Sequence, residues 1–324
     1  MKLTTLVIAG LLLAAAASAR AAPVETYVQT QGPSGFLKGT MLAPADASGA
    51  PVVLIIPGSG PTDRDGNSPL GVKAAPYRLL AEALAGQGVA SVRIDKRGMF
   101  ASAGAGDPNH VTIAAYAADA HAWAASLRHD TGAPCVWLLG HSEGGLVALV
   151  AAQTPQDICG LVLVAAAGRP LADILREQLR ANPANAPLLG EALAAIDKLA
   201  AGQHVDTTGM NPALLPLFYP AVQDFVIDEM SYDPAKLAAA YPGPILVLQG
   251  TTDLQVSLAD AQRLAAARPG IRLVELPGVN HMLKVAPAAP GANAATYADP
   301  SLPLAPGVVE AIATFVKSPA GAPQ

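Results

Sequence analysis

The chain reads Val136-Trp137-Leu138-Leu139-Gly140-His141-Ser142-Glu143-Gly144-Gly145 at the point that decides its fold. The apolar run predicts a buried strand, and the apolar residues that follow Gly145 predict a helix. Glycines stand two positions before and two after the serine, where a tight turn leaves no room for side chains. This Gly-x-Ser-x-Gly pattern between strand and helix is typical of a nucleophile elbow, which presents the serine hydroxyl at the carboxyl end of a sheet.

Short apolar runs recur along the chain and alternate with helical patterns. Strands are predicted at Val52–Ile56, Val89–Ile94, Val136–Leu139, Ile158–Val164, Ile245–Leu248 and Ile271–Leu276, and helices at Pro76–Gln87, Thr112–Leu127, Gly144–Gln153 and Leu258–Ala267. This order predicts an α/β fold with a doubly wound, mostly parallel sheet. Residues 24–43 alternate around a Gly-Pro-Ser-Gly turn, which predicts an antiparallel hairpin.

One interval breaks the alternation, between Gly168 and Pro242. It shows no strand pattern, but its leucine- and alanine-rich stretches, such as residues 171–179 and 188–199, predict helices. We therefore expect a core of residues 23–168 and 243–324 with a helical cap insertion at residues 169–242. An Ala- and Pro-rich loop is expected at residues 285–306, before a last helix near 308–316.

The first residues have a different composition from the rest. Lys2 precedes an apolar stretch from Leu6 to Ala17, and small residues follow, which predicts a signal peptide at residues 1–22 and a periplasmic or secreted protein. An uncleaved N-terminal anchor is the alternative. No later segment stays apolar for the length of a bilayer, so no stable membrane association is expected after signal cleavage. In an oxidising compartment Cys135 and Cys159, the only cysteines, either pair or remain two buried thiols.

Composition narrows the class of partner. The 324 residues carry a formal charge of −5 with no long run of one sign, which disfavours nucleic acid and anionic membranes as partners. A small-molecule substrate is therefore expected. The pattern of residues leaves the oligomeric state open.

A serine hydroxyl becomes a nucleophile when a base removes its proton, and a carboxylate must orient that base. Asp253 lies in the polar loop after the strand at 245–248, and His281 in the loop after the strand at 271–276. Both loops reach the same sheet edge as Ser142, so we expect His281 to be the base and Asp253 its partner. Asp260 is the alternative acid, but its position in the next helix predicts an exposed carboxylate. His141 is the less favoured base, because its side chain leaves the elbow in another direction.

Acyl transfer also needs donors for the oxyanion that forms on the attacked carbonyl. Glu143, the residue after the serine, is expected to supply one backbone N–H. The other is expected from the loop after the strand at 52–56, from Ser59 or, as second choice, Gly60. An ordinary Gly/Pro turn is the alternative reading of this loop.

Five segments together resemble one family: Pro57 to Asn67, Arg93 to Gly98, Gly140 to Gly145, Gly250 to Asp253, and Asn280-His281. They are similar to bacterial α/β-hydrolases of the serine-aminopeptidase-like group, which includes carboxylesterases. The resemblance implies the α/β-hydrolase fold with a helical cap over the active site. Pro57 stands where many relatives carry histidine, so the hydrogen bonding of that loop cannot be carried over. Arg64, Asp65 and Asn67 are expected to brace the loop rather than bind substrate.

The resulting hypothesis is hydrolysis of a small carboxylic ester through an acyl-enzyme, with no metal or organic cofactor. Apolar cap residues are candidates for an acyl pocket, namely Leu217, Phe218, Tyr219 and Met230, although packing in the cap core is the favoured role for most of them. An aminopeptidase would instead need a cap carboxylate for the substrate amine, for which Glu177, Glu191, Asp224, Asp228 and Glu229 are available. Thioesterase and lactonase activities would use the same triad. A catalytically silent binding protein is the non-enzymatic alternative.

Overall fold

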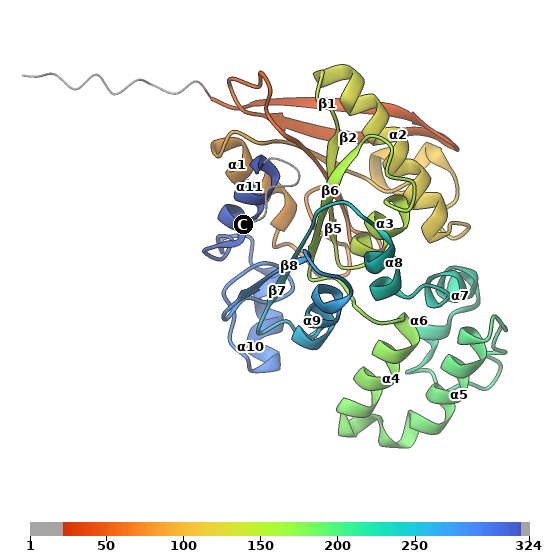
Figure 1. The fold of residues 1–324 in the computed structure, drawn as a ribbon. Coiled ribbons are helices and arrows are strands. Elements are labelled where there is room, and N and C mark those ends of the chain that lie inside the picture. The colour runs from red at the N-terminus through yellow and green to blue at the C-terminus, as the bar shows by residue number, and fades with distance from the viewer. Residues whose placement is uncertain (1–21, 319–324) are drawn as a thin grey trace, which may run out of the picture.

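The computed structural model describes residues 22–318. Within them, eight strands form one sheet in the order β1-β2-β4-β3-β5-β6-β7-β8 (Figure 1). The strands are β1 Val24–Gly32, β2 Gly35–Ala43, β3 Val52–Ile56, β4 Ala90–Ile94, β5 Val136–His141, β6 Ile158–Val164, β7 Ile245–Gly250 and β8 Arg272–Leu276. β1 pairs with β2, and β2 with β4, in antiparallel fashion. The strands from β4 onward in this order, β4-β3-β5-β6-β7-β8, pair in parallel. The predicted doubly wound, mostly parallel sheet is confirmed.

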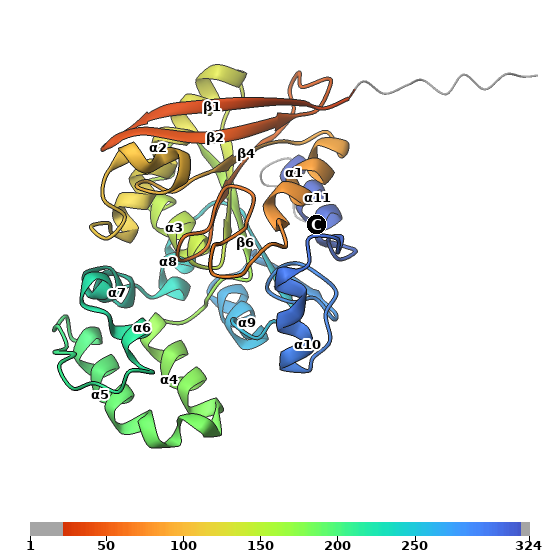
Figure 2. The same cartoon turned by 180° about the vertical axis from the view of Figure 1, so that it is seen from behind.

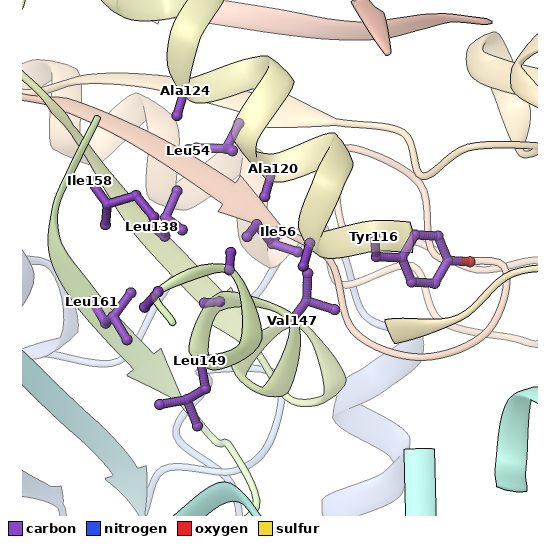
Figure 3. Close-up of a cluster of buried hydrophobic side chains, with 14 of the residues drawn as sticks. Leu54, Ile56, Tyr116, Ala120, Ala124, Leu138, Val147, Leu149, Ile158 and Leu161 are labelled. Carbon is purple, nitrogen blue, oxygen red and sulfur yellow. The ribbon is translucent and has the colours of Figure 1, made fainter. Parts of the chain in front are cut away.

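Helices cover both faces of this sheet. One face packs against α2 (Ile113–Thr131), α3 (Glu143–Ala151) and α9 (Leu258–Ala266), and the other against α1 (Pro76–Gly86) and α11 (Val308–Lys317). Figure 3 shows the first contact, where strand residues such as Leu54 and Leu138 meet Ala120 of α2 and Val147 of α3. Residues of β3 and β5 are buried throughout, which explains their continuous apolar sequence.

The elbow between β5 and α3 is as tight as its glycines predict. Ser142 has φ 55° and ψ −122°, a conformation in which a side chain is strained. A Cβ on Gly140 would lie 2.1 Å from the carbonyl oxygen of Gly144, and one on Gly144 would lie 2.3 Å from that of Ile56. Both positions therefore require glycine, and the turn raises Ser142 above the carboxyl end of the sheet.

The interval between β6 and β7 holds helices α4 Leu171–Ala181, α5 Leu189–Ala200, α6 Leu215–Phe218, α7 Gln223–Met230 and α8 Pro234–Ala240. Helices α4 to α7 stand apart from the sheet, below its carboxyl edge in the view of Figure 1. They share a hydrophobic cluster of their own, which includes Ile196, Phe218 and Met230. We call α4 to α8 the cap.

Two further segments bear on the predictions. The expected loop at residues 285–306 contains a short helix, α10 (Pro290–Ala295), which the Ala- and Pro-rich sequence did not reveal.

Cys135 and Cys159 form a disulfide at the amino ends of β5 and β6, opposite the edge that carries Ser142.

The predicted signal peptide lies outside the described residues except for its last position, and it stays a prediction. Within residues 22–318, no helix is long and apolar enough to cross a membrane. The two views in Figures 1 and 2 place the β1–β2 hairpin at the far edge of the sheet from β7 and β8.

Candidate active site

Ser142, Asp253 and His281 follow β5, β7 and β8, and the parallel strands bring all three to one edge of the sheet. His281 Nδ1 lies 2.8 Å from Asp253 Oδ2, and both side chains are buried. His281 and Ser142 border the same cavity. The structure thus assembles the acid and the base that the sequence predicts beside the predicted nucleophile.

Asp253 is held as a carboxylate. Burial alone raises its pKa, but the charge of His281 and the hydrogen bond from it outweigh burial, so that the pKa lies below its usual value. The N–H groups of Gln255 and Val256 donate to Oδ1 at 2.8 and 3.0 Å, and Gln249 donates to Oδ2 at 3.1 Å. Because Asp253 only accepts, His281 carries its proton on Nδ1, which leaves Nε2 free to take a proton from a serine.

His141 is unsuited to be the base. It is buried, and its Nδ1 lies 2.8 Å from Tyr77 Oη while its Nε2 lies 2.9 Å from the carbonyl oxygen of His281. Burial, followed by the nearby charge of His281, lowers the pKa of His141 to about 3. Both ring nitrogens are therefore occupied, and the ring stays neutral.

Asp260 differs from its prediction. It is 1% exposed rather than a surface carboxylate, and it accepts hydrogen bonds from Arg169 Nε and Nη2, each at 2.8 Å. Ser257 Oγ donates to it at 2.6 Å. Arg169 lies just before α4, so Asp260 ties the start of the cap to α9 and does not reach His281.

The two residues predicted to donate to an oxyanion, Glu143 and Ser59, line one cavity together with Ser142. Glu143 begins α3, directly after Ser142, and Ser59 borders both cavities that adjoin Ser142. The N–H of Gly58 is already donated to Tyr77 Oη at 3.1 Å. Gly60, the second choice, has φ +68° and lies outside both cavities. Ser59 is therefore the better candidate of the two.

Two cavities of about 180 Å³ each adjoin Ser142 and share Ser59 and Gln255. The cap cavity lies beside α4, and its apolar lining comes from Leu146, Leu171, Ile174, Leu175 and Val256. The loop cavity includes His281 and is bordered by hydroxyl groups of Thr62, Ser68 and Tyr297. A larger groove of about 720 Å³ lies by the β1–β2 hairpin, but Ser142, Asp253 and His281 do not border it. The candidate active site is therefore identified by its serine, histidine and aspartate side chains and not by the volume of a cavity.

The prediction of the acyl-pocket residues is corrected by the structure. Phe218 and Met230 are buried in the cap's own hydrophobic cluster, Leu217 packs against it, and Tyr219 is exposed. Neither cavity beside Ser142 includes any of the four. The apolar lining comes instead from α4, which the sequence predicted as a helix without assigning it to the pocket. Its spacing of Leu171, Ile174 and Leu175 over one helix face, directly after β6, is the signal that could have identified it.

One of the five cap carboxylates reaches the site. Glu229 borders the cap cavity, and burial, together with repulsion from Glu143, raises its pKa to about 8. The others have partners elsewhere: Glu177 pairs with Arg169, Asp224 with His204, Asp228 accepts from the N–H of Ile113, and Glu191 from that of Asn211. Glu229 is thus a neutral acid beside Ser142 at neutral pH.

The loop after β3 is braced as expected. Arg64 Nε donates to Asp95 at 3.0 Å, Asp65 pairs with buried Arg93, and Asn67 accepts from the N–H of Ala75 at 3.1 Å. Arg64 and Asp65 border the groove by the β1–β2 hairpin, and none of the three residues borders a cavity beside Ser142. In the part of the chain that the structure describes, no group of three or more His, Cys, Asp or Glu side chains could hold a metal ion.

Comparisons with known proteins show which proteins this chain resembles in sequence and fold. A family model described as serine aminopeptidase, S33, matches residues 70–210, which include Ser142 and end before Asp253. The chain is 25% identical over 254 residues to esterase EstD of Thermotoga maritima, and the match covers 76% of this chain but 58% of that protein. The chain thus spans little more than half the length of this curated relative.

Solved structures with the same fold include esterases. Est1E of Butyrivibrio proteoclasticus, solved with ferulic acid, has 17% identity and a TM-score of 0.56, with 90% of this chain and 96% of that one covered. A thermophilic esterase of Thermogutta terrifontis has 20% identity and a TM-score of 0.52, with 90% and 98% covered. At these identities the likeness establishes a shared fold.

Proposed function

We propose that this chain, which has the α/β-hydrolase fold and is similar to esterases, hydrolyses small carboxylic esters through an acyl-enzyme on Ser142. The observation that carries the proposal is the buried Asp253–His281 pair, 2.8 Å apart, at the cavity that also contains Ser142. A carboxylate that fixes the tautomer of a histidine beside a serine that lines a cavity is what nucleophilic catalysis requires.

In the first half of the proposed reaction, Ser142 Oγ attacks the ester carbonyl while His281 Nε2 takes its proton. Asp253 stabilises the imidazolium, and the N–H groups of Ser59 and Glu143 bind the oxyanion. The C–O bond to the alcohol then breaks, and His281 returns the proton to the alcohol oxygen. Water attacks the acyl-enzyme in the second half with the same proton transfers, which frees the carboxylic acid.

The two cavities suggest how an ester lies in the site. Because His281 protonates the leaving alcohol, the alcohol belongs on the side of His281, in the loop cavity with its hydroxyl groups. The acyl group then occupies the cap cavity, against the apolar side chains of α4. Each cavity, at about 180 Å³, is smaller than the roughly 300–1,000 Å³ of sites for drug-sized ligands, which favours short acyl groups.

Aminopeptidase activity is the second candidate, favoured by the Glu229 carboxyl in the cap cavity. A panel of p-nitrophenyl esters of increasing acyl length, compared with aminoacyl p-nitroanilides, separates the two. We expect turnover of short acyl esters at neutral pH and little cleavage of the anilides. Faster cleavage of the anilides would instead favour the peptidase, and no turnover of either, with no labelling of Ser142 by a fluorophosphonate, would favour a silent binding protein.

We also propose that the protein works in the periplasm or outside the cell, since the Cys135–Cys159 disulfide suits an oxidising compartment. The test is the amount of protein in the periplasmic and culture fractions relative to the cytoplasm, together with thiol titration of the denatured, unreduced protein. We expect no free thiols, and two would contradict it.

A further inference from the structure

Gly58, the residue before Ser59, is held at both its N–H and its carbonyl oxygen by buried polar side chains. It lies against the elbow, since a Cβ on Gly58 would be 3.2 Å from that of Ser142. The preceding residue, Pro57, has no N–H to donate. The hydrogen bonds of this loop therefore come from other groups of this chain.

The carbonyl side of Gly58 is held by Lys96, in the loop after β4. Lys96 Nζ donates to the Gly58 carbonyl oxygen at 2.8 Å and to Glu143 Oε1 at 3.1 Å. The side chains of Lys96 and Glu143 are 4% and 3% exposed. A single ammonium group therefore connects the loop that carries Ser59 to the residue that supplies the other oxyanion donor.

The N–H side of Gly58 is held by Tyr77 of α1. The carbonyl oxygen of His281 can only accept, so His141 Nε2 carries the proton and His141 Nδ1 is an acceptor. Tyr77 must then donate its hydroxyl proton to Nδ1, and its oxygen accepts from the Gly58 N–H. Because burial keeps His141 neutral, this chain of donors runs in one direction from Gly58 through Tyr77 and His141 to His281.

These contacts determine where the Ser59 N–H points. The Gly58 carbonyl and the Ser59 N–H belong to the same peptide group, and all described peptides are trans, so the two point in opposite directions. Lys96 draws the carbonyl oxygen toward itself and borders neither cavity beside Ser142, whereas Ser59 borders both. The ammonium charge also polarises this peptide, which strengthens its N–H as a donor.

We propose that Lys96 and Tyr77 are positioning residues that orient the Ser59 N–H toward the oxyanion formed on Ser142. The inference rests on the proposed acyl-enzyme reaction. It means that these two side chains act on the transition state and not on the bound ester, because the oxyanion exists only after the serine has attacked.

The experiment compares Tyr77→Phe and Lys96→Met with the wild-type protein, and with Tyr241→Phe as a buried tyrosine at the other end of the sheet. Removal of a whole oxyanion donor lowers kcat by about 10²–10³-fold in other enzymes. We expect about 10-fold for Tyr77→Phe and up to about 10²-fold for Lys96→Met, with KM little changed, because both donors remain but are misdirected.

Inhibitor affinities distinguish a positioning role from a purely structural one, which would not change them. A trifluoromethyl ketone forms a hemiketal oxyanion with the serine, whereas the matching methyl ketone binds largely without doing so. Affinity for the trifluoromethyl ketone should fall by the same factor as kcat/KM in each variant, while affinity for the methyl ketone and the apparent pKa of the base in the pH profile stay unchanged. Tyr241→Phe should match the wild type in all three.

Loss of kcat/KM without weaker trifluoromethyl ketone binding overturns the inference, as does wild-type kcat in Tyr77→Phe. If thermal melting shows that Lys96→Met is unfolded, Tyr77→Phe decides alone. Turnover and Ser142 labelling of the wild-type protein test the proposed function separately. If the wild type shows neither, the function fails and this inference fails with it.

Discussion

The catalytic loops and the cap are built in different ways. Around Ser142, the polar groups of Asp253, His281 and Lys96 are buried and bonded to neighbours on several loops of the core. The cap has a hydrophobic cluster of its own in α4 to α7, and it meets the core through apolar packing, such as Phe225 against Tyr116, and through a few polar contacts. These include Arg169 with Asp260, Asp228 with the N–H that begins α2, and Gln178 with the carbonyl oxygen of Gln255. Chemistry and selectivity should therefore respond to different substitutions.

The largest effect is expected from Asp253→Asn. The amide can no longer hold His281 with its proton on Nδ1, so kcat should fall by about 10⁴-fold, as in other triads, with the fold intact. Steady-state kinetics on a p-nitrophenyl ester and a circular dichroism melt measure both quantities.

Asp260→Asn is the matched control for that change. It weakens the bond between Arg169 and α9, which should cost about 1–3 kcal/mol of stability, while kcat stays within a few-fold of the wild-type value. If Asp260→Asn were the variant that abolished turnover, Asp253 would be the wrong acid and the contrast between core and cap would fail.

The same contrast shows what sequence could predict. Ser142, Asp253 and His281 were found because glycine spacing and strand ends are local patterns, and parallel strands bring their carboxyl ends together. The burial of Asp260 was missed because its partner, Arg169, lies 91 residues away. The contact of Lys96 with Gly58 spans 38 residues and was missed for the same reason. No local pattern reveals such contacts.

The pocket was misassigned for a related reason. Leu217, Phe218 and Leu175 are all apolar cap residues, and composition does not distinguish a side chain in the cap's own core from one that faces Ser142. The relative placement of α4 and α6 makes that distinction, and it depends on packing of the whole cap.

A smaller effect on turnover, seen as a change in selectivity, is expected from Leu175→Ala in the cap cavity. Enlarging the cavity should shift the ratio of kcat/KM for longer over shorter acyl esters by about 10-fold, while labelling of Ser142 by a fluorophosphonate continues. Leu217→Ala, in the cap's own core, should lower the melting temperature without changing that ratio. An altered ratio in Leu217→Ala and not in Leu175→Ala would reverse the assignment of the pocket.

The smallest effect concerns pH. The raised pKa of Glu229, about 8, keeps this carboxyl group in the cap cavity mostly uncharged below pH 8 and mostly ionised above it. For esters with apolar acyl groups, kcat/KM should then fall about twofold by pH 8, where half of the groups are ionised, and further above it. Glu229→Gln should remove this decline. A decline that persists in Glu229→Gln would assign it to another group.

The sign for stability follows from the same shift. Between the usual carboxyl pKa and pH 8, Glu229 keeps its proton in the folded state but has lost it in the unfolded state. The stability of the protein therefore falls as pH rises through this range. The melting temperature of Glu229→Gln relative to wild type should rise over this range and level off above pH 8. A constant difference would contradict the raised pKa.

The most direct measurement is the intact mass of the protein after brief treatment with a fluorophosphonate, followed by peptide mapping. We expect one adduct per chain, on Ser142, with slow labelling in Asp253→Asn and none in Ser142→Ala. An adduct on another residue, or equally fast labelling of the wild type and Asp253→Asn, would contradict a serine activated by His281 and Asp253.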